Sequence, residues 1–226
     1  MSISGLNIGG LCPRIPVIQG GMGVGVSLSG LAGAVAAAGG VGGISTAQIG
    51  YREPDFEKDP IACNLRAIAD EIAKARAIAN GGIIGVNIMV ATKRYEDYVK
   101  AAADAGVDLI ISGAGLPMTL PAISGSAKIA PIVSGRKSLH VIARYWQKKY
   151  NRKPDLVVIE GPMAGGHLGF QKEDIEKYTV HGTKDFDEEI RSTIALADEM
   201  EVPVVVAGGV YERSDLDHYL AMGAKG

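Results

Sequence analysis

The sequence predicts an α/β protein with the fold of a (β/α)8 TIM barrel. Short apolar runs rich in Val and Ile recur along the chain, each ends in glycine or a small polar residue, and segments with helical spacing lie between them. The runs are continuously apolar rather than alternating, as expected for strands that are covered on both faces. Strand, glycine and helix follow one another seven times, which is typical of a parallel sheet with helical crossovers.

The predicted strands should be parallel and follow sequential order around the barrel. They are residues 16–20, 41–45, 83–89, 107–112, 129–134, 156–160 and 203–207. The predicted helices are residues 28–38, 61–79, 95–105, 188–200 and 214–222. Ser27 precedes the first helix as a predicted N-cap, and Gly106 follows the third as a predicted C-cap.

The position of the glycines favours a closed barrel over an open, doubly wound sheet. An open sheet that binds a dinucleotide has a G-x-G-x-x-G motif after its first strand. Residues 21–25 read GMGVG, which does not fit that spacing, and Gly40, Gly42 and Gly43 precede or lie within the second predicted strand. The barrel is therefore the preferred architecture.

The length of the chain indicates a barrel that is not complete. A typical TIM barrel has about 250 residues, and this chain has 226. It ends at residues 224–226, where the eighth strand should begin. We expect residues 1–226 to form a single barrel domain truncated before strand 8, with its C-terminal part missing and a gap or an altered closure at that position.

Composition argues against several classes of partner. The chain is 47% hydrophobic and 21% charged, with a formal net charge of -2, so nucleic acid and anionic membrane surfaces are not expected partners. Residues 15–51 carry no charge, but their many glycines would weaken a membrane-spanning helix. Cys12 and Cys63 lack metal-ligand spacing. We expect a cytoplasmic protein without a metal site.

Candidate ligand-binding residues follow the predicted strands, because a TIM barrel places its active site at the carboxyl ends of its strands. Gly208 and Gly209 follow the seventh run and could point N–H groups at a phosphate, helped by the dipole of a helix that starts near Ser214. The alternative is an ordinary turn between strand and helix. The position after strand 7 is the usual phosphate site of a barrel.

Polar residues at three other strand ends each have two interpretations. Asn87 could hydrogen-bond the edge of a heterocycle or cap the following loop. Glu160 could contact a ligand or simply end its strand. Arg136 and Lys137 could reach a phosphate or lie in solvent at the start of a helix.

His167 is the strongest candidate for catalysis. It lies in a glycine-rich loop after the sixth run, and an imidazole suits proton transfer near neutral pH. The alternative is an exposed loop histidine, which is the interpretation for His140, His181 and His218.

Several of these stretches together resemble a known family. Residues 16–23 (PVIQGGMG), 85–87 (GVN), 160–161 (EG), 164–169 (AGGHLG) and 207–209 (AGG) are similar to the nitronate monooxygenases, formerly called 2-nitropropane dioxygenases. The FMN-dependent enoyl-acyl-carrier-protein reductases share this pattern. The resemblance extends from Pro13 to the last residue, and its most specific part is the histidine stretch.

The resemblance implies an FMN-binding barrel and assigns roles to individual residues. Gly21, Met22 and Gly23 would lie along the flavin, Asn87 would contact the flavin ring or its polar chain, Gly208 and Gly209 would hold the phosphate, and His167 would be catalytic. The polar segment 171–189 departs from the pattern and would form a lid or an oligomer contact, with a homodimer as the assembly considered.

The activity implied by the resemblance is oxidation of an alkyl nitronate, or of its parent nitroalkane, by dioxygen to a carbonyl compound and nitrite. The alternative is a reductase that passes hydride from NAD(P)H through FMN to an enoyl thioester. A phosphate-binding barrel without redox activity is a third hypothesis, from a different class.

Overall fold

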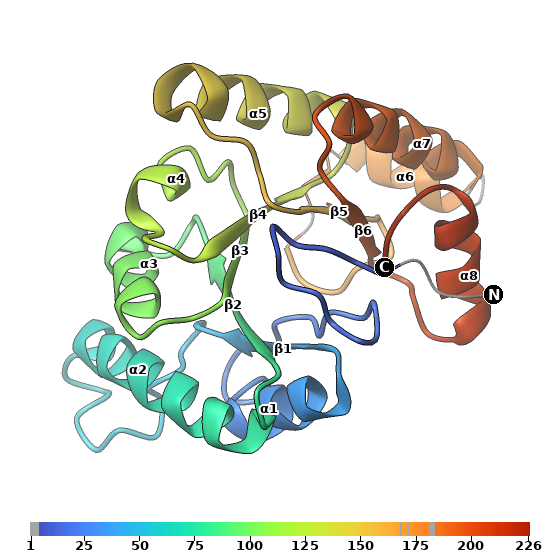
Figure 1. The fold of residues 1–226 in the computed structure, drawn as a ribbon. Coiled ribbons are helices and arrows are strands. Elements are labelled where there is room, and N and C mark those ends of the chain that lie inside the picture. Colours follow the sequence, from blue (N-terminus) through green and yellow to red (C-terminus); the bar gives the residue numbers. More distant parts are fainter. Residues whose placement is uncertain (1–4, 168, 171, 181–183) are drawn as a thin grey trace.

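The computed structural model describes residues 5–167, 169–170, 172–180 and 184–226. The strands form a ring around a central axis, and helices surround the ring (Figure 1). The sheet order is β1-β2-β3-β4-β5-β6, and each strand pairs in parallel with the next. The strands are β1 (Val41–Ser45), β2 (Ile83–Met89), β3 (Leu109–Gly113), β4 (Lys128–Val133), β5 (Val157–Glu160) and β6 (Val204–Ala207). The predicted parallel, sequential order is confirmed for these six.

The first predicted strand, residues 16–20, forms a single parallel bridge instead of a strand. Ile18 is bridged to Val41, and the Gln19 N–H donates to the Val41 carbonyl at 3.0 Å. Pro16 has no N–H to donate, and the Val17 N–H turns back to the Ile15 carbonyl at 2.8 Å. The prediction of a full strand was wrong for this reason, although the segment does lie beside β1.

The last residues lie between β6 and this first segment. The Lys225 N–H donates to the Val204 carbonyl at 2.7 Å, and the Val206 N–H donates to the Gly226 carbonyl at 3.1 Å. A Cβ on Gly226 would lie 2.5 Å from the Pro16 carbonyl oxygen. Residues 225–226 therefore occupy the expected position of the eighth strand and touch the segment that begins the barrel.

Helices connect the strands on the outside of the ring. They are α1 (Ser29–Ala38), α2 (Pro60–Ala79), α3 (Tyr95–Asp104), α4 (Leu120–Ile123), α5 (Arg136–Tyr150), α6 (Lys172–Val180), α7 (Lys184–Glu199) and α8 (Arg213–Ala221). The five helices with predicted bounds correspond to α1, α2, α3, α7 and α8, while no bounds were predicted for α4, α5 and α6. Within the described ranges, no helix combines the length and the apolar character needed to cross a membrane.

The start of α1 is capped differently from the prediction. Leu28, not Ser27, is the N-cap residue, and it provides no side-chain hydrogen bond. The Ser29 N–H donates instead to the Glu71 carboxylate of α2 at 2.8 Å. The Ser27 hydroxyl is used inside the barrel mouth, as described below.

The N-terminal segment fills one end of the barrel. Leu6 and Ile8 are fully buried and pack with Val41, Leu109 and Leu156, which lie at or just before the amino ends of their strands. Figure 1 shows this segment, in blue, passing through the middle of the ring. With the amino end plugged by apolar side chains, the carboxyl end is left to form a ligand site.

Candidate active site

A cavity of about 960 Å³ opens at the carboxyl ends of the strands. This volume lies within the usual range for small-molecule and cofactor sites. The seven residues predicted to bind a cofactor or to act in catalysis all line it: Gly21, Met22, Gly23, Asn87, His167, Gly208 and Gly209. The structure therefore brings the predicted residues together, and their individual roles stay predictions.

The glycine loop, which follows residues 16–20, packs directly over β2. A Cβ on Gly21 would lie 2.5 Å from the Asn87 Cβ, and one on Gly23 would lie 3.0 Å from the Ala47 Cβ. Real Cβ atoms do not approach a neighbour as closely as the first of these distances, so any side chain at position 21 would displace Asn87. Glycine at position 21 thus allows the loop backbone to lie against the cavity wall.

The shape of this loop depends on Gln19 and Ser27, neither of which was assigned a role in the site from the sequence. The buried Ser27 hydroxyl accepts hydrogen bonds from the Gln19 side-chain amide at 2.9 Å and from the Met22 N–H at 3.0 Å. It donates to the Gly20 carbonyl at 3.3 Å. The donor and both acceptor positions of the hydroxyl are therefore used. The polar side chain of Gln19 in an otherwise apolar run was the feature of the sequence that could have indicated this role.

The loop after β1 supports the glycine loop from the other side. Thr46 donates to the Asn87 carbonyl from both its N–H and its hydroxyl, each at 3.1 Å. The Val24 N–H donates to the Ala47 carbonyl at 2.9 Å. A Cβ on Gly25 would overlap the ring of Tyr51. The positions of β2, the glycine loop and the loop after β1 are therefore linked.

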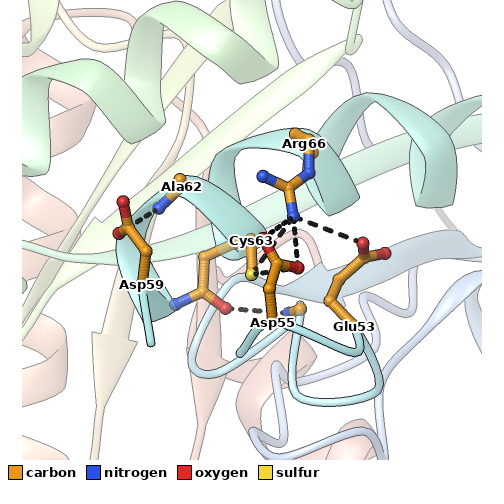
Figure 2. A network of polar contacts seen from close by, with 8 residues as sticks. Glu53, Asp55, Asp59, Ala62, Cys63 and Arg66 are labelled. Atoms are coloured by element: carbon orange, nitrogen blue, oxygen red, sulfur yellow. Dashed lines mark hydrogen bonds and ion pairs between the residues drawn. The ribbon is translucent and has the colours of Figure 1, made fainter. Parts of the chain in front are cut away.

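A polar network anchors the loop after β1 to the start of α2 (Figure 2). The Arg66 guanidinium donates to Asp55 at 2.8 and 3.0 Å and to the Cys63 sulfur at 3.2 Å, and the thiol donates to Asp55 at 3.2 Å. Burial and the neighbouring Asp55 raise the pKa of the Cys63 thiol. Because the thiolate is the reactive form, we interpret Cys63 as a structural residue.

The side chain of Asn87 is available to a ligand. It is half-buried in the cavity wall, and its carboxamide has no hydrogen-bond partner in the part of the chain that the structure describes. In the alternative interpretation, Asn87 caps the following loop. That role would need a hydrogen bond between the Asn87 side chain and the loop, and none is present among the described residues. The free donors and acceptor favour contact with a bound molecule.

Gly208 and Gly209 form a turn at the edge of the cavity. Both have left-handed backbone angles, with φ of +89° and +78°, and no described residue accepts a hydrogen bond from either N–H. Successive N–H groups in such turns are typical of phosphate sites. A Cβ on Gly208 or Gly209 would lie 2.9 Å from the Cβ of Ala164 or Met163, respectively, so this turn also packs against the histidine loop.

The expected contribution of a helix dipole to this phosphate site is not supported. Helix α8 starts at Arg213, and its first turn is capped by its own carboxylates. Asp215 accepts from the N–H groups of Tyr211 and Glu212 at 2.8 and 3.0 Å, and these hydrogen bonds lower its pKa. Side chains of the protein therefore already occupy this helix end, and the prediction of a phosphate site is left with the two glycine N–H groups.

His167 lies in the exposed loop that follows β5 and lines the cavity. The preceding Gly166 has a φ of +103°, and a Cβ on Gly165 or Gly166 would meet no atom within 4 Å. Glu160, the last residue of β5, also lines the cavity and is half-buried. Burial raises the pKa of the Glu160 carboxyl, and a positive charge on His167 opposes that shift.

Other candidates from the sequence lie elsewhere. The Arg136 N–H donates to the Glu189 carboxylate of α7 at 2.7 Å, and the Arg136 guanidinium donates to the Ser192 carbonyl of the same helix at 2.8 Å. It and Lys137 therefore belong to the outer face of α5, not to the cavity. Among described residues, no group of three or more His, Cys, Asp or Glu is placed to hold a metal.

The remaining histidines do not join the site. His140 is an exposed residue of α5, and His218 of α8 contacts Asp187 at 3.0 Å. His181 lies outside the described residues, as do Gln171 and two other positions of the segment 171–189. The described part of that segment contains α6 and the start of α7, and its role as a lid or oligomer contact stays a prediction.

Solved structures share this fold at low sequence identity. FabK from Thermotoga maritima matches with 22% identity and a TM-score of 0.68, over 94% of this chain and 56% of that one. A nitroalkane oxidase from Streptomyces ansochromogenes matches with 19% identity and a TM-score of 0.72, over 94% and 64%. The flavin-binding domain of baker's yeast flavocytochrome b2 matches with 14% identity and a TM-score of 0.64, over 98% and 58%. This chain spans less than two thirds of the length of each.

The sequence itself matches a family model. No curated protein matches the chain at a significant level, whereas the model described as nitronate monooxygenase matches residues 10–226. That match contains the complete cavity lining described above. The chain therefore belongs to the nitronate monooxygenase family.

Proposed function

We propose that the protein binds FMN in this cavity and oxidises alkyl nitronates with dioxygen to a carbonyl compound and nitrite. One observation carries the proposal: a single cavity unites the glycine loop, a histidine, and a carboxamide and a pair of N–H groups that have no hydrogen-bond partner among the described residues. Family membership and structural neighbours named as oxidases or flavin-binding proteins support a flavin-dependent oxidoreductase.

The residues present fit FMN in both shape and polarity. Gly208 and Gly209 would hold its phosphate, and the backbone at Gly21, which packs against Asn87 without room for a side chain, would lie along the flavin. The Asn87 carboxamide would bond the polar edge of the flavin ring or the polar chain. Apolar side chains of β2 and β3, Met89 and Ile111, supply an apolar wall for the ring.

Bound FMN would supply the electron chemistry of the reaction. The protein's own contribution would centre on His167. With a neutral nitroalkane, the imidazole would take the α-proton, the C–H bond would break, and its electron pair would pass to the nitro group to give the nitronate. With a nitronate already formed, the imidazolium would hold the anionic oxygens.

Product analysis of the flavin-loaded protein tests the proposal. With a nitronate in air, we expect oxygen uptake together with release of nitrite and a carbonyl compound, and little dependence on added NADH. If the protein binds FMN but turns over only an enoyl thioester with NAD(P)H, the reductase alternative replaces this proposal. If the natural protein carries no flavin at all, a phosphate-binding barrel without redox activity is the better description.

A further inference from the structure

The histidine loop, residues 161–170, joins β5 to α6 and carries His167. The stretch from Gly165 to His167 has little support from the rest of the described chain. A Cβ on Gly165 or Gly166 would meet no atom within 4 Å, and Gly166 has a φ of +103°. No hydrogen bond between described residues involves this stretch. Because glycine adds backbone freedom, the position of His167 depends on how the two ends of the loop are held.

Both ends of the histidine loop contact one residue of α7, Phe186. At the start of the loop, a Cβ on Gly161 would lie 2.9 Å from the Phe186 Cε1 atom, so the backbone lies directly against the edge of the ring. At the other end, the ring centroids of Phe170 and Phe186 are 5.8 Å apart, with an interplanar angle of 69°. Phe186 is buried and does not itself line the cavity. It therefore supports the loop from behind.

Tyr178 of α6 completes an aromatic cluster with these two phenylalanines. Its ring centroid lies 5.8 Å from that of Phe170 and 5.3 Å from that of Phe186, and both pairs are edge-to-face. Aromatic pairs in this geometry are favourable beyond the apolar area that they bury. The cluster thus joins the end of the histidine loop to two helices.

The start of α7 is itself held on two sides, so Phe186 has a fixed position. The carboxylate of the next residue, Asp187, lies 3.0 Å from the His218 Nε2 atom of α8. The Glu189 carboxylate accepts from the Arg136 N–H of α5 at 2.7 Å. These contacts connect the first turns of α7 to both α8 and α5.

We propose that Phe186 is a positioning residue, which holds both ends of the histidine loop so that His167 is directed at a bound substrate. This inference rests on the proposed function, in which His167 takes the α-proton. Proton transfer needs the two groups within hydrogen-bond reach, and a displacement of about 1 Å can cost on the order of 10²-fold in rate. Phe186 would act through His167 without touching the substrate.

Replacement of Phe186 should therefore slow turnover. In the flavin-loaded protein, Phe186→Leu should lower kcat for a neutral nitroalkane by about tenfold, because leucine keeps the site apolar but lacks the ring edges that meet the loop. Phe170→Leu removes the same contact from the loop side and should reproduce the loss, so the test does not depend on the folding of one variant. Unchanged kcat in both variants would overturn the proposal.

A residue of the same helix provides the matched control. Ile194 and Phe186 are each 5% exposed. Ile194 lies about two turns further along α7, where it packs beside Gly223 at the end of α8. Ile194→Val should leave kcat unchanged. A loss equal to that of Phe186→Leu would show that any weakened packing of α7 slows the reaction, and would overturn a specific role for Phe186.

A double variant distinguishes positioning from a general structural defect. In the His167→Ala background, Phe186→Leu should cause no further loss of kcat, because the group that it positions is already gone. A further loss as large as that in the wild-type background would contradict an action through His167.

Amide hydrogen exchange of the flavin-free protein gives a readout independent of turnover. Exchange in residues 161–167 should be several-fold faster in Phe186→Leu than in wild type, and unchanged in Ile194→Val. If exchange behaves in this way but wild type oxidises no nitro compound, the proposed function is wrong and the support of the loop by Phe186 holds. If wild type oxidises nitro compounds but exchange is the same in Phe186→Leu, the positioning role is wrong.

Discussion

Glycines serve two different purposes around this cavity. At Gly21 the lack of a side chain creates space, because a Cβ would lie 2.5 Å from the Cβ of Asn87. At Gly208 the left-handed backbone, with φ of +89°, leaves an N–H group without an acceptor in the described part of the chain. In the proposed site, the first purpose would shape a wall for a planar ligand, and the second would provide a donor for an anion.

Replacement of His167 tests its proposed role in catalysis. His167→Ala should retain FMN, because the phosphate and ring contacts come from other residues, while kcat/KM falls by roughly 10²–10⁴-fold if proton transfer limits the rate. The loss should be larger with a neutral nitroalkane than with its nitronate, which has already lost the proton. Flavin absorbance and steady-state kinetics on both substrates measure this.

The two substrates also distinguish roles for the imidazole. Equal losses on both would show that His167 orients the anion rather than removing a proton. A loss of less than a few-fold on both would make the histidine a bystander and contradict the proposed mechanism.

Gly208 substitutions test the phosphate site. Gly208→Asp should abolish FMN retention by placing a carboxylate beside the phosphate, but φ of +89° and the contact with Ala164 mean that any side chain also causes strain. Gly208→Ala carries the strain without the charge. We expect the Asp variant to bind FMN at least about tenfold more weakly than the Ala variant, roughly 1.4 kcal/mol, in equilibrium titrations.

A control for this comparison is Gly106→Asp. Gly106 also has a left-handed φ, of +72°, but a Cβ there would meet no atom within 4 Å, and the residue does not line the cavity. FMN affinity should be unchanged in this variant. Equal affinities of Gly208→Ala and Gly208→Asp would place the phosphate elsewhere.

Helix α1 depends on a residue of α2 for its N-terminal cap. Burial alone would raise the pKa of Glu71, but hydrogen bonds from Ser29 and the charge of Lys74 outweigh it, so the pKa is lowered from 4.5. A carboxylate with a lowered pKa in the folded state stabilises the protein above its unfolded-state pKa. That stabilisation is lost as the pH falls below 4.5 and through the folded-state value.

Substitution of Glu71 tests this cap. Glu71→Ala should lower the free energy of unfolding by about 0.5–2 kcal/mol at neutral pH, as for other lost N-caps. The difference from wild type should shrink as the pH falls below 4.5. Urea denaturation at several pH values measures both effects, and a difference that does not depend on pH would contradict the role of the charge.

The sequence allowed prediction of those elements whose own residues carry the pattern. Helix α2 has an apolar face at helical spacing, and it was predicted within one residue of its observed bounds. Helix α5 buries Leu139, Ile142 and Trp146 at the same spacing, yet its many basic residues concealed the pattern. The segment 16–20 has the composition of a strand, but Pro16 and the turn at Val17 limit it to one bridge.

The convergence of the site was predictable because parallel strands in a barrel have their carboxyl ends on one side. Residues as distant in sequence as Gly21, Asn87 and Gly208 line one cavity for this reason. The contacts within the site were not predictable, because loop shape has no periodicity. Ser27, for example, is a residue type typical of helix caps. Its hydroxyl instead accepts a hydrogen bond from the side chain of Gln19, eight residues away, and so holds the glycine loop.

The whole barrel has one plugged end and one open end, and the open end is the proposed flavin site. The nitronate monooxygenase and reductase alternatives share this architecture. They differ in the compound that delivers electrons to the flavin.

The most direct test of the account is the absorbance of the bound flavin when oxygen is absent. A nitronate should bleach the yellow flavin absorbance rapidly, and admission of air should restore it with release of nitrite. NADH or NADPH should bleach it slowly or not at all. Rapid bleaching by a nicotinamide, with no response to a nitronate, would contradict the proposed function and assign the cavity to a reductase.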